Sequence, residues 1–458
     1  MKKFFGGFLL GFLLVFYTPA NAKDACYPEF EISKSIISTQ SNEDSGDKSV
    51  FIYFDQSLSM QGFTKDQPGQ NNLYVNVIDD LQQIAENVGS KTYYHSFGKI
   101  IKPIKENKIS QVIKPGFYEC TSSASECNNQ ESKISDPFKA AKANPDGTYI
   151  IVTDLFLSSK QLVGGTLNQL TKPLKSLLKK GKSIGIIGVM SSFNGTIYDI
   201  PTREGGTVSY TEAQKRPFYI IIIGDQKEIN EVKKNLEEQH FTNPEDKYKF
   251  SLITSSPVLQ NLNNEKLITE KNIKNIYKAE NFSFEYDDRD LAIFAFDTNN
   301  KRKINFKVKK EGVIEVKGST GIGEFLIKER LWTSTESKCK KINWEQAKLE
   351  NISSVVKNEE ELHIKMFDKK NSLKNLFRGW RYFYVAEIYA NKPGSASEDT
   401  FKEWSIRDSD AEEFKDGNPL EFKTLNLTKI IKILNSVAND EFEPTLIASV
   451  ALDFDLTK

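Results

Sequence analysis

Four apolar runs separated by helical patterns constrain the fold of this chain more than any other feature. Continuous apolar strands of this kind are typical of a sheet that is covered on both faces. Strands that alternate with helices predict an α/β fold with a doubly wound, mostly parallel sheet. The four runs are Val50–Phe54 (VFIYF), Thr148–Thr153 (TYIIVT), Lys182–Met190 (KSIGIIGVM) and Pro217–Gly224 (PFYIIIIG).

The segments between these runs supply the helices and two further strands. Apolar side chains at helical spacing predict an amphipathic helix over Asn72–Val88, and Ser135 is the expected N-cap of a short helix over Asp136–Ala143. Two more helices are predicted over Leu167–Lys179 and Glu228–Gln239. Further strands are expected at Lys91–Phe97 and Ile100–Ile104.

The pattern changes after about residue 255. Alternating segments there predict antiparallel strands, and one helix is expected at Asn426–Val437. The predicted division is therefore an N-terminal segment at 23–47, an α/β domain at 48–255 and a β-rich C-terminal domain at 256–458. The alternating segments are Lys303–Val308, Val313–Lys317, Tyr382–Tyr389 and Leu446–Phe454.

The first 22 residues have the pattern of a secretory signal peptide. Lys2 and Lys3 precede an apolar stretch of about 14 residues, and Ala20-Asn21-Ala22 resembles a cleavage site. The stretch is shorter than the roughly 20 residues that cross a bilayer, so cleavage is favoured over an uncleaved anchor. We expect a bacterial-type protein that is periplasmic or secreted and is not an integral membrane protein after cleavage.

Charge and cysteine content limit the remaining possibilities. The chain has 62 basic and 62 acidic side chains, without a basic face or tail, and so nucleic acid is not an expected partner. An even number of cysteines in an exported chain suggests two disulfides. Cys120–Cys127 is the favoured pair and leaves Cys26 for Cys339, with free thiols and a zinc site as the alternatives.

One loop combines several oxygen-bearing side chains. Asp55, Ser57 and Ser59 alternate directly after the first apolar strand, and Asp154 follows the strand that ends at Thr153. Ligands of doubly wound sheets lie beyond the carboxyl ends of the strands, where these oxygens can converge. Carboxylates and hydroxyls form a hard site that suits Mg²⁺ or Mn²⁺.

These residues resemble the von Willebrand factor A (vWA) family. Asp55-Gln56-Ser57-Leu58-Ser59 is similar to the DxSxS motif of its metal-ion-dependent adhesion site, and Ile150–Asp154 is similar to the strand that carries the late aspartate. The resemblance covers about residues 48–240 and implies a vWA-like, Rossmann-like sheet. It implies that Ser57 and Ser59 bind the metal directly, and that Asp55 and Asp154 act largely through bound water.

The resemblance also implies a fifth ligand, which is a threonine in the family. Ser135 stands at about that place, with Ser132 and Thr121 as rivals. The chain departs from the family at Leu58 and Leu155, where glycine is common.

The function favoured by these features is that of a non-enzymatic module that binds a protein through the metal. An acidic residue of the partner would complete the coordination of the Mg²⁺ or Mn²⁺ ion, as is common in the family. The sequence contains no identifiable catalytic constellation, and we expect no enzymatic activity. Two alternatives stay open: a metal-assisted hydrolase of the cell envelope, and a vWA-like scaffold without metal.

Overall fold

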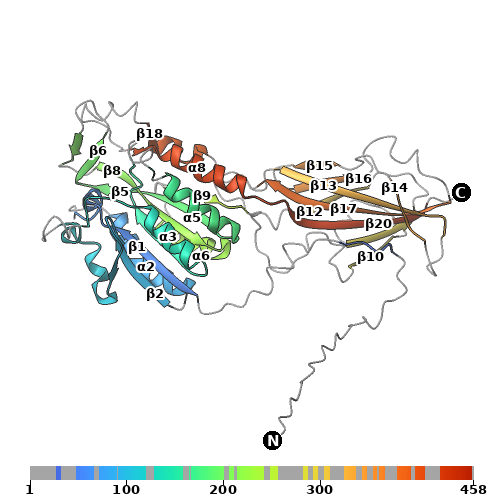
Figure 1. Ribbon diagram of the computed structural model, residues 1–458, viewed down its shortest axis with the longest axis horizontal. Coiled ribbons are helices and arrows are strands. Elements are labelled where there is room, and N and C mark those ends of the chain that lie inside the picture. Colours follow the sequence, from blue (N-terminus) through green and yellow to red (C-terminus); the bar gives the residue numbers. More distant parts are fainter. Residues whose placement is uncertain are drawn as a thin grey trace, which may run out of the picture.

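A computed structural model gives the fold of this chain (Figure 1). It describes residues 27–31, 48–65, 72–89, 91–119, 128–157, 165, 167–200, 206–210, 214–241, 248–255, 282–286, 292–297, 304–309, 324–336, 343–347, 354–357, 361–366, 379–392, 398–407 and 423–455. The predicted signal peptide, all four cysteines and the strand expected at Val313–Lys317 lie outside the described residues, and so do the predicted disulfides.

The first body of the molecule is built on a seven-stranded sheet with the order β3-β2-β1-β4-β8-β5-β9. Four strands, β1, β2, β4 and β5, point in the same direction, which confirms the coarse prediction of an α/β fold with a mostly parallel central sheet, although β3, β8 and β9 run antiparallel to their neighbours. The strands are β1 (Ser49–Asp55), β2 (Lys91–Phe97), β3 (Lys102–Ile104), β4 (Thr148–Thr153), β5 (Ser183–Phe193), β8 (Gln214–Gly224) and β9 (Tyr248–Ile253).

The direction of β8 was not foreseen. This strand lies between β4 and β5 and runs antiparallel to both, so that Tyr219 faces Thr153 and Arg216 faces Ser191. A hairpin of β6 (Thr196–Ile200) and β7 (Gly206–Ser209) connects β5 to β8 without a crossover helix. The start of β8 therefore lies at the edge of the sheet where β1 and β4 end.

Helices cover both faces of this sheet (Figure 1). One face buries α2 (Leu73–Val88) and α6 (Gln226–His240) together with the apolar side chains of β1, β4 and β8. The other face buries α3 (Ser135–Ala143), α5 (Leu167–Lys179) and α8 (Leu427–Asp440). No helix of the described part of the chain is long and apolar enough to cross a membrane.

The starts of α2, α3, α6 and α8 differ by one or two residues from the sequence prediction, and the first two have a clear physical reason. Asn72 is the N-cap of α2, and its side-chain oxygen accepts hydrogen bonds from the amides of Tyr74 and Val75. Ser135 was expected to cap α3 but is its first helical residue. Ile134 takes the capping position, and its side chain has no atom that could accept a hydrogen bond. The buried hydroxyl of Ser135 donates to Gln169 of α5 instead.

The second body is β-rich, as predicted. Its six-stranded sheet has the order β10-β11-β20-β17-β13-β14, and a separate sheet has the order β12-β16-β15. All pairs in these two sheets are antiparallel except β11 with β20, which is parallel. The strands are β10 (Phe282–Tyr286), β11 (Ala292–Asp297), β12 (Ile304–Lys309), β13 (Glu324–Ser334), β14 (Glu345–Ala347), β15 (Ser354–Lys357), β16 (Glu361–Met366), β17 (Arg381–Lys392) and β20 (Thr445–Asp455).

The predicted boundary near residue 255 does not separate the two hydrophobic cores. After β17 the chain returns to the first body as η6 (Glu398–Trp404), β18 (Ser405–Ile406), β19 (Thr424–Leu425) and α8. Phe401, Trp404 and Ile431 belong to the same buried cluster as Ile151 of β4. Only β20 then goes back to the β-rich sheet, and the sequence prediction therefore assigned α8 to the wrong core.

The first residues that the structure describes, 27–31, also lie on the β-rich body. Tyr27 and Phe30 pack on Phe383 and Trp332, with ring centroids 5.0 and 4.8 Å apart, respectively. Arg330 donates a hydrogen bond of 3.0 Å to the carbonyl oxygen of Glu31. Residues 27–31 are thus fixed to the sheet formed by the second half of the sequence.

Candidate metal site at the ends of β1 and β4

The parallel pairing of β1 and β4 brings the two predicted aspartates to one edge of the sheet. Phe54 lies opposite Val152 in the register, so β1 ends at Asp55 next to the point where β4 ends at Thr153. Asp154 follows directly. Asp55 and Asp154 are 0% and 2% exposed, and a buried carboxylate requires hydrogen bonds or an opposite charge.

Asp55 accepts hydrogen bonds on both oxygens. Its Oδ1 accepts from the backbone amide of Ser57 at 2.9 Å. Its Oδ2 accepts from the hydroxyls of Ser132 at 2.6 Å and Thr153 at 2.7 Å. The carboxylate is therefore held in one orientation by three neutral donors, which the loop after β1, the loop before α3 and the end of β4 supply.

Ser57 and Ser59 follow Asp55 in the same loop, and their hydroxyl oxygens lie 3.2 Å apart. Two neighbouring ligands of an octahedral Mg²⁺ ion, each at about 2.0–2.1 Å, would be separated by about 2.9 Å. The loop that carries the serines is anchored by the amides of Gln56 and Leu58, which donate to the carbonyl oxygens of Phe97 and Asn129. At 3.2 Å the two hydroxyls are hydrogen-bonded to each other and lie slightly farther apart than two neighbouring ligands of Mg²⁺.

The three candidates for the fifth ligand are placed differently. The Ser132 hydroxyl donates to Asp55 and is part of the site. The Ser135 hydroxyl donates instead to Oε1 of Gln169 at 3.1 Å, so the structure brings Ser132 rather than Ser135 to Asp55. Thr121 lies outside the described residues. The assignment of Ser135 as a ligand is not supported by this contact, and Ser132 is the better candidate.

Asp154 forms a buried ion pair that sequence reasoning missed. Its Oδ2 accepts a hydrogen bond of 2.8 Å from Nη2 of Arg216, and its Oδ1 accepts from the amide of Phe156 at 3.2 Å. The side chains of Arg216 and Asp154 are 0% and 3% exposed. The guanidinium also lies 4.8 to 5.8 Å from the ring centroids of three phenylalanines, namely Phe63, Phe156 and Phe193.

The antiparallel direction of β8 explains why this ion pair was missed. If β8 were parallel to β4, Arg216 at its start would lie at the opposite edge from Asp154. A signal was nevertheless present, because Arg216 directly precedes the apolar run of β8 and a charge in such a position needs a partner.

The residue after Asp154 adopts an unusual backbone conformation. Leu155 has a φ of 49°, in the left-handed region that glycine adopts more readily than residues with a Cβ atom. The chain therefore makes a left-handed turn directly after Asp154 with leucine at a position that favours glycine.

The two carboxylates influence each other electrostatically. Burial, and then the neighbouring charge of Asp154, raise the pKa of Asp55 to about 6, although hydrogen bonds from Ser132 and Thr153 oppose the shift. Burial lowers the pKa of Arg216, and Asp154 opposes that shift. With both aspartates ionised, the site holds two negative charges and one positive charge, which leaves a net negative charge for a cation to neutralise.

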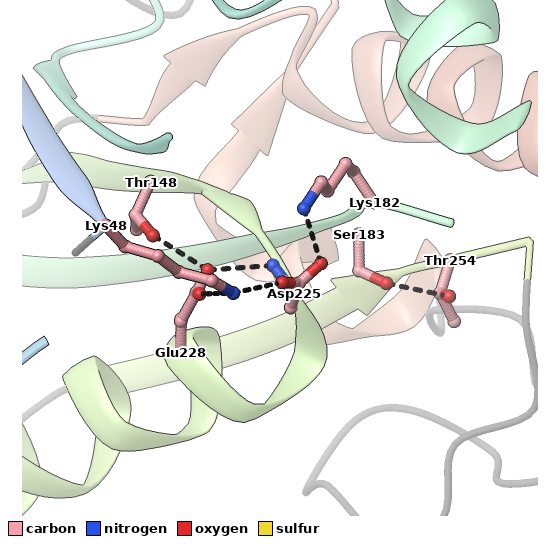
Figure 2. Close-up of polar contacts among 7 residues, drawn as sticks. All are labelled: Lys48, Thr148, Lys182, Ser183, Asp225, Glu228 and Thr254. Atoms are coloured by element: carbon pink, nitrogen blue, oxygen red, sulfur yellow. Dashed lines mark hydrogen bonds and ion pairs between the residues drawn. The ribbon is translucent and has the colours of Figure 1, made fainter. Parts of the chain in front are cut away.

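A second polar cluster lies at the opposite edge of the sheet, where β1, β4 and β5 begin (Figure 2). Asp225 accepts from Lys48 at 2.6 Å and Lys182 at 2.7 Å, and Glu228 accepts from Lys48 and from the hydroxyl of Thr148. Asp225 and Glu228 also form a capping box at the start of α6. These contacts join α6 to the sheet, and we interpret the cluster as structural.

Among the residues that the structure describes, no three His, Cys, Asp or Glu side chains form a group that could hold a metal ion. The site at Asp55 is of another kind, since it combines two carboxylates with hydroxyls. Comparisons of the chain with protein-family models, curated proteins and solved structures found no match.

Proposed function

We propose that this protein is an extracytoplasmic module that binds another protein through a Mg²⁺ or Mn²⁺ ion held by a vWA-type site. The observation that carries the proposal is the loop after β1, in which the hydroxyls of Ser57 and Ser59 lie 3.2 Å apart and the amide of Ser57 donates to the buried carboxylate of Asp55. Ser57 and Ser59 would bind the ion directly. Asp55 and Asp154 would orient bound water, and Ser132 is the candidate for the remaining ligand.

A cation held by neutral hydroxyls on one side favours an anionic ligand on its open side. An acidic side chain of a partner protein would supply that charge, and the surrounding surface would determine specificity. The chain's own part in binding is to fix the orientation of the oxygens. The three hydrogen bonds to Asp55 and the anchored loop at Gln56 and Leu58 support this role.

One observation favours a second candidate, a vWA-like scaffold that holds no metal. Arg216 already provides a positive charge for Asp154 at 2.8 Å. In this alternative, the hydroxyls and carboxylates serve only to hold the loops after β1 and β4. No contact among the described residues specifically favours the metal-assisted hydrolase.

The experiment that separates these candidates is calorimetric titration of Mg²⁺ and of Mn²⁺ into the metal-free mature chain. We expect saturable binding that is lost in the double variant Asp55→Ala, Ser57→Ala. Ser132→Ala and Ser135→Ala form a matched pair, because each removes one hydroxyl but only Ser132 contacts Asp55. Weaker binding in the first and unchanged binding in the second would support the assignment of Ser132.

The absence of heat with both metals, in a chain that circular dichroism shows to be folded, would favour the scaffold. Where metal binds, the next measurement is binding of a peptide rich in aspartate and glutamate, with and without a chelator. The amidated peptide, which carries asparagine and glutamine instead, is its control. Equal binding of the two peptides would contradict recognition through an acidic side chain.

A further inference from the structure

Arg216 supplies the positive charge that faces Asp154 in the candidate site. Its Nη2 atom lies 2.8 Å from Oδ2 of Asp154, whose Oδ1 accepts from the amide of Phe156. Both oxygens of Asp154 are thus engaged within the protein. Any Mg²⁺ or Mn²⁺ ion that uses Asp154 must share this carboxylate with the guanidinium or take it over.

We propose that Arg216 is a built-in counter-ion that competes with the divalent cation for Asp154 and thereby sets the affinity of the site. This inference rests on the proposed function, because it requires that the site bind a divalent cation. Two positive groups that attract the same buried carboxylate oppose each other, since each reduces the electrostatic gain of the other. The ion pair with Arg216 is the state without metal, and metal binding weakens this ion pair.

The surroundings of the guanidinium connect this exchange to the loops of the site. Phe63 lies in η1 (Leu58–Phe63), the short helix that carries Ser59, while Phe156 follows Asp154 by two residues. Phe193 ends β5 and packs so closely on Gly62 that a Cβ atom there would lie 2.3 Å from its ring. Movement of Arg216 would therefore disturb the same segments that hold the metal-binding oxygens.

The test is a comparison of Mn²⁺ affinity between the wild-type chain and the variants Arg216→Gln and Arg216→Lys. We expect Arg216→Gln to bind Mn²⁺ at least about tenfold more tightly, because the competing charge is removed. Arg216→Lys keeps that charge and is expected to bind like the wild type. The gain from Arg216→Gln should disappear in an Asp154→Asn background, since the two residues then no longer share a carboxylate.

The outcomes separate this inference from the proposed function. Wild-type binding that depends on Asp55 and Ser57 but is unchanged or weakened in Arg216→Gln would overturn the competition and leave the metal site standing. A gain that persists in the Asp154→Asn background would also overturn it. If neither the wild type nor Arg216→Gln binds Mn²⁺, the proposed metal site itself fails.

Arg216→Gln also leaves the buried Asp154 without its counter-ion and can impair folding. A second measurement covers this case. Thermal unfolding is followed at increasing Mn²⁺ concentration, because a ligand of the folded state raises the unfolding temperature. A larger rise in Arg216→Gln than in the wild type supports the competition, and an equal or smaller rise contradicts it.

Discussion

Replacement of Ile431 by alanine tests whether α8 is part of the core of the α/β body. Ile431 is 1% exposed and lies in the same buried cluster as Ile151 of β4 and Leu174 of α5. The substitution removes three carbon atoms, worth about 2.4 kcal/mol at about 0.8 kcal/mol each. The remaining cavity adds to this loss, whereas the better helix propensity of alanine offsets roughly half a kcal/mol. We expect a net loss of about 3 kcal/mol.

The assay must report on one body of the molecule, because a chain with two cores need not unfold in a single step. Hydrogen exchange measured by mass spectrometry gives the opening free energy of individual strands. Ile431→Ala should lower the protection of β4 and β5, although residue 431 is about 280 positions away from β4 in the sequence. Lys432→Ala is the matched control, because Lys432 is exposed on the same helix.

Two results would refute this reasoning. Protection of β4 and β5 that is the same in Ile431→Ala and Lys432→Ala would show that α8 does not stabilise the α/β body. A loss of protection confined to β17 and β20 would place α8 with the β-rich sheet, as the sequence prediction had it.

Three further predictions follow from the structure. A chain ending at Ser255 lacks η6 and α8 and should not give a cooperative thermal transition. These elements bury six large aliphatic or phenylalanine side chains, each worth roughly 1.5–3 kcal/mol. The summed loss is as large as the total stability of a typical domain. In urea unfolding, the free energy of unfolding of Leu155→Gly should be about 0.5–1 kcal/mol higher than that of Leu155→Ala, which is the reverse of the usual order. Both variants lose the packing of the leucine side chain, but only glycine relieves the strain of the left-handed backbone. The raised pKa of Asp55, about 6, means that the metal-free folded state holds its proton more tightly than the unfolded chain. Wild-type stability relative to Asp55→Asn should therefore be highest below about pH 4 and fall as the pH rises to about 6, and a constant difference between pH 4 and 7 would contradict this.

Most elements of the α/β body could be predicted because each depends on local patterns, whereas β6, β7 and β9 were not predicted. The apolar runs of β1, β4, β5 and β8 and the helical spacing of α2 have a single physical explanation, namely burial on one or both faces. The position of Asp55 and Asp154 at one edge followed from the ends of two parallel strands. These inferences required no knowledge of distant contacts.

The remaining features depend on contacts between distant parts of the chain. The apolar pattern of a strand does not indicate its direction within the sheet, so the pattern of β8 did not reveal that Arg216 contacts Asp154. Ser132 and Ser135 are three residues apart, and their spacing in the sequence did not reveal that Ser132 contacts Asp55 whereas Ser135 contacts Gln169. The apolar face of α8 indicated burial, but not which of the two cores would receive it.

The passage from α8 to β20 has a mechanical consequence. Only residues 441–444 separate the helix from the strand. Oε1 of Glu441 lies 2.5 Å from Nζ of Lys175 in α5. The start of α8 is tied to the loop after Asp154, since Asn426 donates a hydrogen bond of 3.1 Å to the carbonyl oxygen of Leu157. β20 in turn lies between β11 and β17 within its sheet. A pulling force applied at the candidate site would thus pass along α8 and load β20 lengthwise, against two rows of hydrogen bonds at once.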